Sequence, residues 1–318
     1  MEKSQAKAHT NIALIKYWGK ENASLNLPTT SSLSMTLDKF YSQTSLSLNL
    51  DSKEDQLIIN GKKSDSQRVH RFLNIFRSDF KDFPSLLIES ENHVATSAGL
   101  ASSASAFAAL TVAINQFLKL NLSERDLSRY ARRGSGSASR SIFGNFVIWN
   151  KGVDDRSSYA ESFWDEDIQL SMIVAEVSSL EKKISSSQGM QIAQASKGYA
   201  DWVKKSESQL QEMKIGIKQS DIERVGLIAE VNALSMHELN RQCSQPFDYF
   251  VKETYELVDF AQKCYKEGML SFVTIDAGPN VKIITDRATE QALLKKLKEN
   301  FPQIKFNLAH AGPGVSFG

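Results

Sequence analysis

The sequence is short of the residues and runs that mark several protein classes. Its only cysteines, Cys243 and Cys264, form no CxxC pair, so neither a disulfide framework nor a cysteine-rich zinc site is expected, and a reducing cytoplasm fits. No apolar run reaches about 18 residues, and the polar N-terminus lacks a signal-peptide core, so we expect no membrane span and no secretory signal. The formal net charge of +1 gives no bulk attraction for nucleic acid or membrane surfaces.

Metal-binding patterns are missing as well. The five histidines are scattered, and His237-Glu238 lacks the second histidine of an HExxH zinc helix. A transition metal held by protein ligands is therefore not expected. A Mg²⁺ ion that arrives with a nucleotide stays open, because phosphates supply most of its ligands. Hydrophobic residues make up 41% and charged residues 24% of the 318 positions, as in globular proteins of one large or two medium domains.

The most informative stretch is residues 90–117, where a short apolar strand pattern runs into a loop of small residues and then a long helical pattern. Small residues before a helix leave backbone N–H groups open, and these groups with the helix dipole suit a phosphate. Small residues can equally serve close packing, and serines are ordinary N-caps. The loop is neither a Walker A loop nor a GxGxxG fingerprint. From the loop alone, phosphate binding and close packing both stay open.

A basic segment, Lys16-Tyr17-Trp18-Gly19-Lys20, follows an apolar strand pattern at 12–15. Lysine supplies a point charge and tyrosine an O–H donor, so the segment can grip an anion. It can equally be a solvated strand end with Trp18 packed on the surface. Taken alone, the segment favours this second interpretation.

Two further segments combine small and basic residues. Residues 133–140 read RGSGSASR, and a helical turn there would place Ser137 and Arg140 on the same side at spacing i, i+3. The guanidinium fork suits a carboxylate or a phosphate. A flexible linker is the alternative, but the flanking arginines and the strand expected at 145–149 fit it less well. Lys182, Lys183 and the serines at 185–187 form a third anion-friendly patch before a helix.

Asp276 ends an apolar strand pattern and faces a Gly-Pro turn. A carboxylate in this place can cap the turn, or it can lie in a cleft as a proton acceptor. The pattern alone slightly favours the turn role.

The remaining patterns predict a mixture of strands and helices. Asn60-Gly61 is a hairpin signal between two short strands. Residues 150–168 read as a surface loop, with the acidic residues 165–167 interpreted as a solvated charge run. Residues 191–240 are almost entirely helical in pattern, with a break at Ser220-Asp221, whose residue types favour caps and turns.

Taken together, four motifs resemble one family. NIALIKYWGK, SAGLASSAS, GSGSASRS and DAGPN, in this order and spacing, are similar to the motifs of the mevalonate diphosphate decarboxylases of the GHMP kinase superfamily. The resemblance covers about residues 6–286. The serine-rich loop alone indicates only the superfamily, whereas KYWGK with GSGSASR and DAGPN is specific to the decarboxylase branch.

The resemblance implies a two-domain α+β fold. An N-terminal domain at 1–180 would be ribosomal S5-like and carry the ATP loop, and a C-terminal domain at 181–318 would be ferredoxin-like and carry the aspartate. The active site would lie in the cleft between them. The implied protein is a cytoplasmic homodimer that does not bind nucleic acid or membranes.

The implied reaction uses ATP and Mg²⁺. ATP phosphorylates the 3-hydroxyl of mevalonate 5-diphosphate, and loss of phosphate and CO₂ then gives isopentenyl diphosphate and ADP. Two alternatives stay open: a GHMP-type small-molecule kinase that stops at phosphorylation, and a non-enzymatic module that binds phosphorylated ligands.

The resemblance also carries site residues onto this chain, with no metal ligand among them. Those with catalytic roles are Asp276, Arg140, Asn11 and Ser137. Those expected at the substrate are Tyr17, Trp18, Gly19, Lys20, Ser135, Gly136, Ser137, Ala138, Ser139, Arg140, Ser186, Ser187 and Met190. Those expected at the nucleotide are Arg68, Ser90, Gly99, Leu100, Ala101, Ser102, Ser103, Ala104 and Ser105.

Two positions depart from the family pattern. Ala95 stands where many members have proline, which would loosen the entry to the phosphate loop. Ser187 stands where some bacterial members have arginine, which would weaken one diphosphate contact or leave it to another residue.

Overall fold

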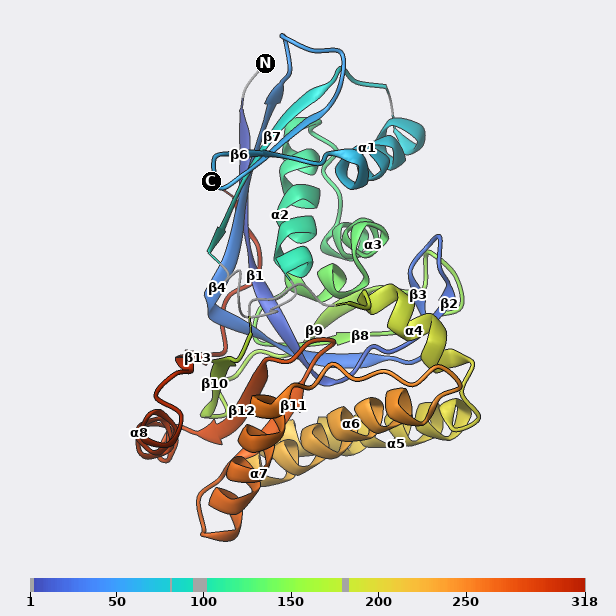
Figure 1. Cartoon of the computed structure of the whole chain (residues 1–318). Helices are drawn as coiled ribbons and strands as arrows, with labels where there is room; N and C mark the ends of the chain where they lie inside the picture. The colour runs from blue at the N-terminus through green and yellow to red at the C-terminus, as the bar shows by residue number, and fades with distance from the viewer. Residues whose placement is uncertain (1–2, 81, 94–101, 179–182, 318) are drawn as a thin grey trace.

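The computed structural model describes residues 3–80, 82–93, 102–178 and 183–317, which form an α+β fold (Figure 1). The strands are β1 (Ser4–Ile15), β2 (Lys20–Asn22), β3 (Leu27–Pro28), β4 (Ser32–Leu48), β5 (Gln56–Ile59), β6 (Lys62–Ser64), β7 (Leu86–His93), β8 (Phe146–Trp149), β9 (Ala160–Trp164), β10 (Leu170–Glu176), β11 (Phe272–Ile275), β12 (Val281–Asp286), β13 (Lys305–His310) and β14 (Ser316–Phe317). The helices are α1 (Gln67–Asp79), α2 (Ser102–Phe117), α3 (Glu124–Gly134), the 3-10 helix η1 (Gly136–Ile142), α4 (Ser186–Gln194), α5 (Tyr199–Lys218), α6 (Ile222–Gln242), α7 (Lys252–Lys266) and α8 (Glu290–Asn300).

The larger sheet has the order β14-β1-β4-β7-β5-β6, and β8 and β9 extend it from the first half of β4. Its described pairs are antiparallel except β5–β7. The long strand β4 pairs with β1 along most of its length, and the register shifts near His9 and Ala13. Each shift marks a bulge or another irregularity of the pairing, a feature that bends strands. The two long strands therefore run from the upper part of the molecule in Figure 1 down to the site.

Helices α1, α2 and α3 cover one face of the upper part of this sheet (Figure 1). Alanines at 108, 109 and 113 on α2 are fully buried, and their short side chains let this helix lie close along β1 and β4. Phe72 and Phe107 meet edge to face between α1 and α2, a preferred geometry for aromatic pairs. This packing places the N-terminal end of α2 beside the site.

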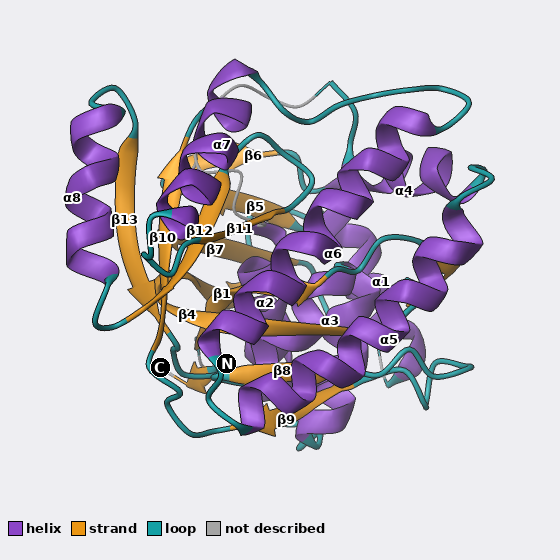
Figure 2. Cartoon of the chain, turned by 90° about the horizontal axis from the view of Figure 1, so that it is seen from below, coloured by secondary structure: helices purple, strands orange, loops and turns teal. Residues whose placement is uncertain are grey.

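The smaller sheet has the order β11-β12-β10-β13 and is antiparallel throughout. Alternate residues of β10 face opposite sides, as the pleat requires. Met172 and Val174 pack into a core shared with α5, α6 and the larger sheet. Ile173 and Ala175 pack into a second core with α7 and α8. Figure 2 shows α5 and α6 side by side and α8 next to β13.

Several sequence expectations are confirmed. Asn60 and Gly61 both have positive φ, at 48° and 74°, as a two-residue hairpin requires. The helical run breaks at Ser220, and the Asp221 side chain caps α6 by accepting from the Arg224 N–H. Residues 165–167 are exposed, as expected for a solvated acidic run.

Other expectations are wrong. Residues 160–164 form strand β9 and not part of a surface loop, because β8 offers them a free edge to pair with. The helical run at 191–240 has a second break at 195–198, between α4 and α5.

Strand β10 precedes residue 180 yet belongs to the smaller sheet, so the domain boundary at 180 stays a prediction. No described helix is long and apolar enough to cross a membrane.

Candidate functional site

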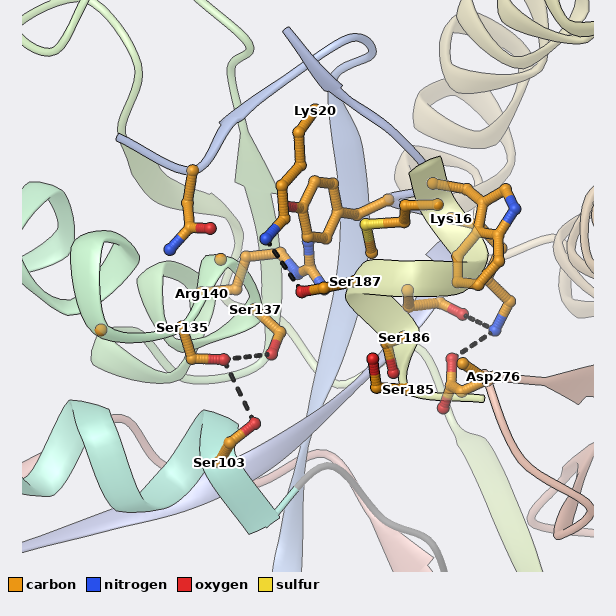
Figure 3. Close-up of a pocket in the computed structure, with 18 of the residues that line it drawn as sticks. Lys16, Lys20, Ser103, Ser135, Ser137, Arg140, Ser185, Ser186, Ser187 and Asp276 are labelled. Atoms are coloured by element: carbon orange, nitrogen blue, oxygen red, sulfur yellow. Dashed lines mark hydrogen bonds and ion pairs between the residues drawn. The ribbon is translucent and has the colours of Figure 1, made fainter. Parts of the chain in front are cut away.

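A cavity of about 1040 Å³ opens where the two sheets and helix α4 meet. Its walls come from distant parts of the chain: the end of β1, the first turns of α1 and α2, the α3–η1 junction, the start of α4 and the loop between β11 and β12. Serine hydroxyls and the cationic groups of lysine and arginine supply much of the polar lining (Figure 3). This lining suits an anionic ligand that carries several phosphates.

The segment after β1 is buried, so the solvated strand end favoured by its sequence is wrong. The side chains of Lys16 and Trp18 are each only 2% exposed. The Trp18 indole N–H donates to Asn240 Oδ1 at 2.9 Å, and the Lys16 backbone N–H donates to Asn232 Oδ1 at 2.8 Å. Both asparagines lie on α6 and are buried. Helix α6 therefore fixes the basic segment against the cavity.

The Asp276 carboxylate faces two lysines, and no described hydrogen bond joins it to the backbone of its turn. Lys16 Nζ lies 2.7 Å from Asp276 Oδ1, and Lys282 Nζ lies 3.2 Å from Oδ2. Each ammonium also donates to a backbone carbonyl, that of Ala13 or of Asn280. The Asp276 side chain is 26% exposed, so it is open to the cavity, which Lys16 also lines and Lys282 does not.

Burial and the neighbouring charges shift the pKa values of the groups in this cluster. Burial lowers the pKa of Lys16 to about 8, although Asp276 partly opposes the shift. Burial alone would raise the pKa of Asp276, but the charges of Lys16 and Lys282 outweigh it and hold the pKa well below its usual range. At neutral pH the cluster therefore contains a carboxylate and an ammonium on Lys16.

Arg140 lies on η1 and is held from two sides. Its Nε donates to Asn11 Oδ1 at 3.1 Å and its Nη1 donates to Ser32 Oγ at 2.5 Å. Asn11 in turn donates to the Ser137 carbonyl and the Ser141 hydroxyl. Burial lowers the pKa of Arg140 to about 10, with Asp276 opposing the shift. The guanidinium therefore stays charged at neutral pH and keeps a fixed orientation.

Two groups of serines face the cavity from opposite sides (Figure 3). Ser103, Ser135 and Ser137 form one chain of hydroxyls, with oxygen separations of 3.2 and 3.5 Å. Ser185, Ser186 and Ser187 open helix α4, where the Ser185 side chain and Gln188 form a capping box. Lys20 Nζ donates to Ser187 Oγ at 3.1 Å. The second group thus joins a helix N-terminus to a lysine, a combination that suits an anion.

Further features test whether phosphates fit this cavity. Three arginines, Arg68, Arg71 and Arg133, also line it. Burial is the larger cause that lowers the pKa of Arg68, and the nearby charge of Arg71 is the smaller one. The buried hydroxyl of Tyr17 has no hydrogen-bond partner among the described residues. No described cluster of three or more His, Cys, Asp or Glu side chains could hold a metal. The residues therefore fit phosphate groups, and a Mg²⁺ ion would rely on those phosphates for most of its ligands.

The structure brings together most of the residues that the sequence predicted for the site. The cavity is lined by Asn11, Tyr17, Trp18, Lys20, Arg68, Ser103, Ser135, Gly136, Ser137, Arg140, Ser186, Ser187, Met190 and Asp276. Their individual roles stay predictions.

Five predicted residues lie in the packed interior and away from this lining: Ala104 and Ala138 are fully buried, Ser90 and Ser105 hydrogen-bond to Thr44 and Ser42 on β4, and Ser139 donates to the Gly136 carbonyl. Gly19 is also not part of the lining, and the Tyr199 and Thr29 side chains pack against it. Gly99, Leu100 and Ala101, with Ala95 and Lys182, lie outside the described residues, and Ser102 begins α2.

The sequence reading missed Lys16 and Lys282 as partners of Asp276. The signal for Lys282 was a single lysine inside the apolar strand 281–285, directly after the DAGPN turn. The signal for Lys16 was its place at the end of a wholly apolar run. A lysine is almost never fully buried unless it is paired, so either lysine, once buried with its strand, predicts a carboxylate partner.

Gly19 gives a testable consequence of this packing. Its φ is +135°, and a Cβ there would lie 1.7 Å from the Tyr199 hydroxyl, which bridges Trp18 and Thr29. We expect Gly19→Ala to lower the free energy of unfolding by about 2–4 kcal/mol, from backbone strain and overpacking. Denaturant unfolding would measure the loss. Gly61→Ala is the matched control, since its φ is +74° but nothing lies within 4 Å; equal losses in both variants would contradict the expectation.

Two family models match the chain. One, described as "Diphosphomevalonate decarboxylase-like N-terminal domain", matches residues 8–160. The other, described as "Mevalonate 5-diphosphate decarboxylase C-terminal domain", matches residues 172–312. Together they include every residue that lines the cavity.

Individual proteins agree with the family models. The chain is 33% identical to the diphosphomevalonate decarboxylase of Debaryomyces hansenii, over 95% of this chain and 84% of that protein. A crystal structure of mevalonate diphosphate decarboxylase from Staphylococcus aureus superposes with a TM-score of 0.95 and 39% identity, covering 100% of this chain and 98% of the other. A structure described as MDDEF in complex with MVAPP, AMPPCP and magnesium gives a TM-score of 0.94 and 41% identity, covering 99% and 98%. The chain belongs to the diphosphomevalonate decarboxylase family.

Proposed function

We propose that the cavity carries out the family's reaction, the ATP-dependent decarboxylation of mevalonate 5-diphosphate to isopentenyl diphosphate, ADP, phosphate and CO₂. The observation that carries this proposal is the arrangement of one carboxylate, Asp276, and one buried guanidinium, Arg140, inside a cavity with two serine groups and several cations. A substrate with a diphosphate, a hydroxyl and a carboxylate needs these three kinds of partner.

The diphosphate of the substrate is assigned to the wall of the cavity at the start of α4. Lys20, Ser186 and Ser187 lie together at the start of α4, where the helix dipole adds to the lysine charge. Tyr17, Ser135 and Ser137 face the same space, and the unpaired hydroxyl of Tyr17 is a free donor among the described residues. These groups would hold the diphosphate and leave the other end of the substrate near Asp276.

The nucleotide side is assigned to the first turn of α2 and to Arg68. Ser103 lies in this turn, and Arg68 lies over the ring of Phe107 on α2 and donates to the Gly134 carbonyl at 2.9 Å. ATP phosphates would lie against this end of the cavity. Mg²⁺ would bind with those phosphates and neutralise part of their charge as the phosphoryl group is transferred.

Asp276 would accept a hydrogen bond from the 3-hydroxyl of the substrate and orient it toward the phosphoryl group. Its lowered pKa makes it a weak base. Phosphoryl transfer with a loose transition state depends more on positioning than on early proton removal. The substrate hydroxyl therefore gives up its proton late, and the two lysines keep the carboxylate in place until then.

Arg140 would hold the substrate carboxylate. The guanidinium already uses two N–H groups on Asn11 and Ser32, which leaves part of the fork for a ligand. A carboxylate that must leave as CO₂ has to be oriented and yet able to lose its charge. A partly used guanidinium binds it without enclosing it.

A direct assay tests the function and separates the alternatives. Incubation with mevalonate 5-diphosphate, ATP and Mg²⁺ should release ADP and CO₂ in equal amounts. A 3-phosphorylated acid that accumulates without CO₂ would indicate the kinase alternative. If adding mevalonate diphosphate causes no release of ADP, the protein would be a non-enzymatic binding module.

Two further proposals concern the setting of the enzyme. We propose a cytoplasmic location, which the two buried free cysteines support. We also propose a homodimer, as the family resemblance implies. Sedimentation of the purified chain over a concentration series would test the dimer.

Lys16 gives a pH prediction. Because its pKa is about 8, the lysine is charged below that pH and loses its proton above it. The ion pair with Asp276 is then lost, so kcat/KM should fall about tenfold per pH unit above pH 8. Lys16→Arg is the matched control, because a guanidinium stays charged to much higher pH. An alkaline limb at the same pH in both enzymes would contradict the assignment.

A further inference from the structure

Lys282 is an unusual residue for its place in the fold. It is the second residue of β12, a middle strand of the smaller sheet, and lies opposite Thr274 on the edge strand β11. Its neighbours Val281 and Ile283 are fully buried, and Lys282 itself is only 1% exposed. A buried ammonium is costly unless it is paired. A charged lysine can therefore be buried at this position only with an anionic partner.

The partner is the carboxylate proposed to meet the reacting hydroxyl. Lys282 Nζ lies 3.2 Å from Asp276 Oδ2 and 3.2 Å from the Asn280 carbonyl. Lys16 occupies the other oxygen, Oδ1, at 2.7 Å. The two lysines approach the carboxylate from different elements, one from the segment after β1 and one from β12.

Two ion pairs fix what one leaves free. The last torsion of an aspartate side chain is broad, so a single contact leaves the carboxylate plane able to turn. Lys16 on Oδ1 and Lys282 on Oδ2 together define that plane. The loop 276–280 is held at the same time, because the Lys282 ammonium ties the Asn280 carbonyl to the carboxylate at the loop's start.

We propose that Lys282 is a positioning residue for the reaction: with Lys16 it fixes the plane of the Asp276 carboxylate toward the substrate hydroxyl. The proposal rests on the proposed function. Lys282 lies behind Asp276 and does not line the described cavity, so it acts through the carboxylate and not on the substrate.

The surrounding charges predict a readout that a merely structural role would not change. Asp276 is faced by Lys16 after β1, Lys282 on β12 and Arg140 on η1. His237 on α6 lies nearby, and burial lowers its pKa to about 3, so it is neutral at the pH of the assays. Removing Lys282 removes one of the charges that lower the pKa of Asp276. The acidic limb of the pH–rate profile should therefore move to higher pH.

The main test variant is Lys282→Met, which keeps an unbranched side chain one atom shorter than lysine and removes the charge. With mevalonate diphosphate, ATP and Mg²⁺, kcat should fall about 10- to 100-fold, the cost of slight misplacement of a reacting group. The KM for ATP should change less than about twofold, and the acidic limb should move upward. Lys305→Met is the matched control: Lys305 pairs with Glu176 on a neighbouring strand of the same sheet, at 3.3 Å, and its loss should change neither kcat nor the limb.

A double variant separates positioning from general damage. In an Asp276→Asn background, Lys282→Met should lower kcat no further, because its effect passes through the missing carboxylate. An unchanged kcat and limb in the single variant, or an additive loss in the double variant, would overturn the proposal. If thermal melting shows that Lys282→Met does not fold, Lys282→Arg is tested in its place. Its kcat should fall while the acidic limb of its pH–rate profile stays where it is in the wild type. A kcat equal to that of the wild type would overturn the proposal.

Failure of the proposed function would look different. Wild-type enzyme without release of ADP and CO₂ from mevalonate diphosphate would refute the reaction itself. An active wild type with an unaffected Lys282→Met variant would refute only the role of Lys282.

Discussion

Asp276→Asn is expected to lower kcat for the decarboxylation by about two to four orders of magnitude, the usual contribution of a group that handles a proton in the transition state. The amide keeps the shape of the carboxylate but removes its charge. Lys16 and Lys282 then lose their common anionic partner. Steady-state kinetics with ADP and CO₂ followed together would measure the effect. The KM for ATP should stay near the wild-type value, because the assigned nucleotide wall is at α2 and Arg68.

The same variant tests the energetics of the cluster. Breaking a buried ion pair typically costs about 3–5 kcal/mol, because the remaining charge is left unpaired. Lys16, whose pKa is already about 8, can relieve part of this cost by releasing its proton. Asp276→Ala removes the hydrogen-bonding group as well and is expected to be less stable than Asp276→Asn in denaturant unfolding. A turnover near the wild-type value in either variant would refute the role of Asp276.

Arg140→Gln is expected to lower kcat/KM for mevalonate diphosphate by about 10²- to 10³-fold. A buried charged partner that is truncated costs about 2–5 kcal/mol, and 1.4 kcal/mol corresponds to a factor of ten. Glutamine can still reach toward Asn11 or Ser32 but carries no charge for the substrate carboxylate. Initial rates over a matrix of both substrates would show whether the loss falls on mevalonate diphosphate or on ATP.

Arg140→Lys is the matched control for charge. It keeps a cation in the cavity but lacks the fork that contacts Asn11 and Ser32 at once. We expect a loss between those of wild type and Arg140→Gln. A defect confined to the KM for ATP would show that Arg140 contacts the nucleotide and not the substrate carboxylate. Full activity in the lysine variant would show that charge alone is enough and that orientation by Asn11 is not needed.

Local patterns were enough for much of the fold. The hairpin at Asn60-Gly61, the cap at Asp221 and the strand that ends before Asp276 depend on a few adjacent residues, whose backbone preferences act over short distances. The strand β9 was missed because its pairing edge, β8, is supplied by tertiary structure. Edge pairing of a polar segment leaves little trace in its own sequence.

For the site, the sequence by itself determined which segments carry serines, cations and the carboxylate, and the motif resemblance assigned them to one reaction. Only the tertiary structure decided which of these groups meet. Lys16 and Asp276 lie 260 positions apart in the chain, and α6 buries the lysine by binding its segment through Asn232. A lysine at a strand end is solvated or buried according to what packs against it. Its charge then requires a carboxylate, and only the fold brings Asp276 and Lys282 to it.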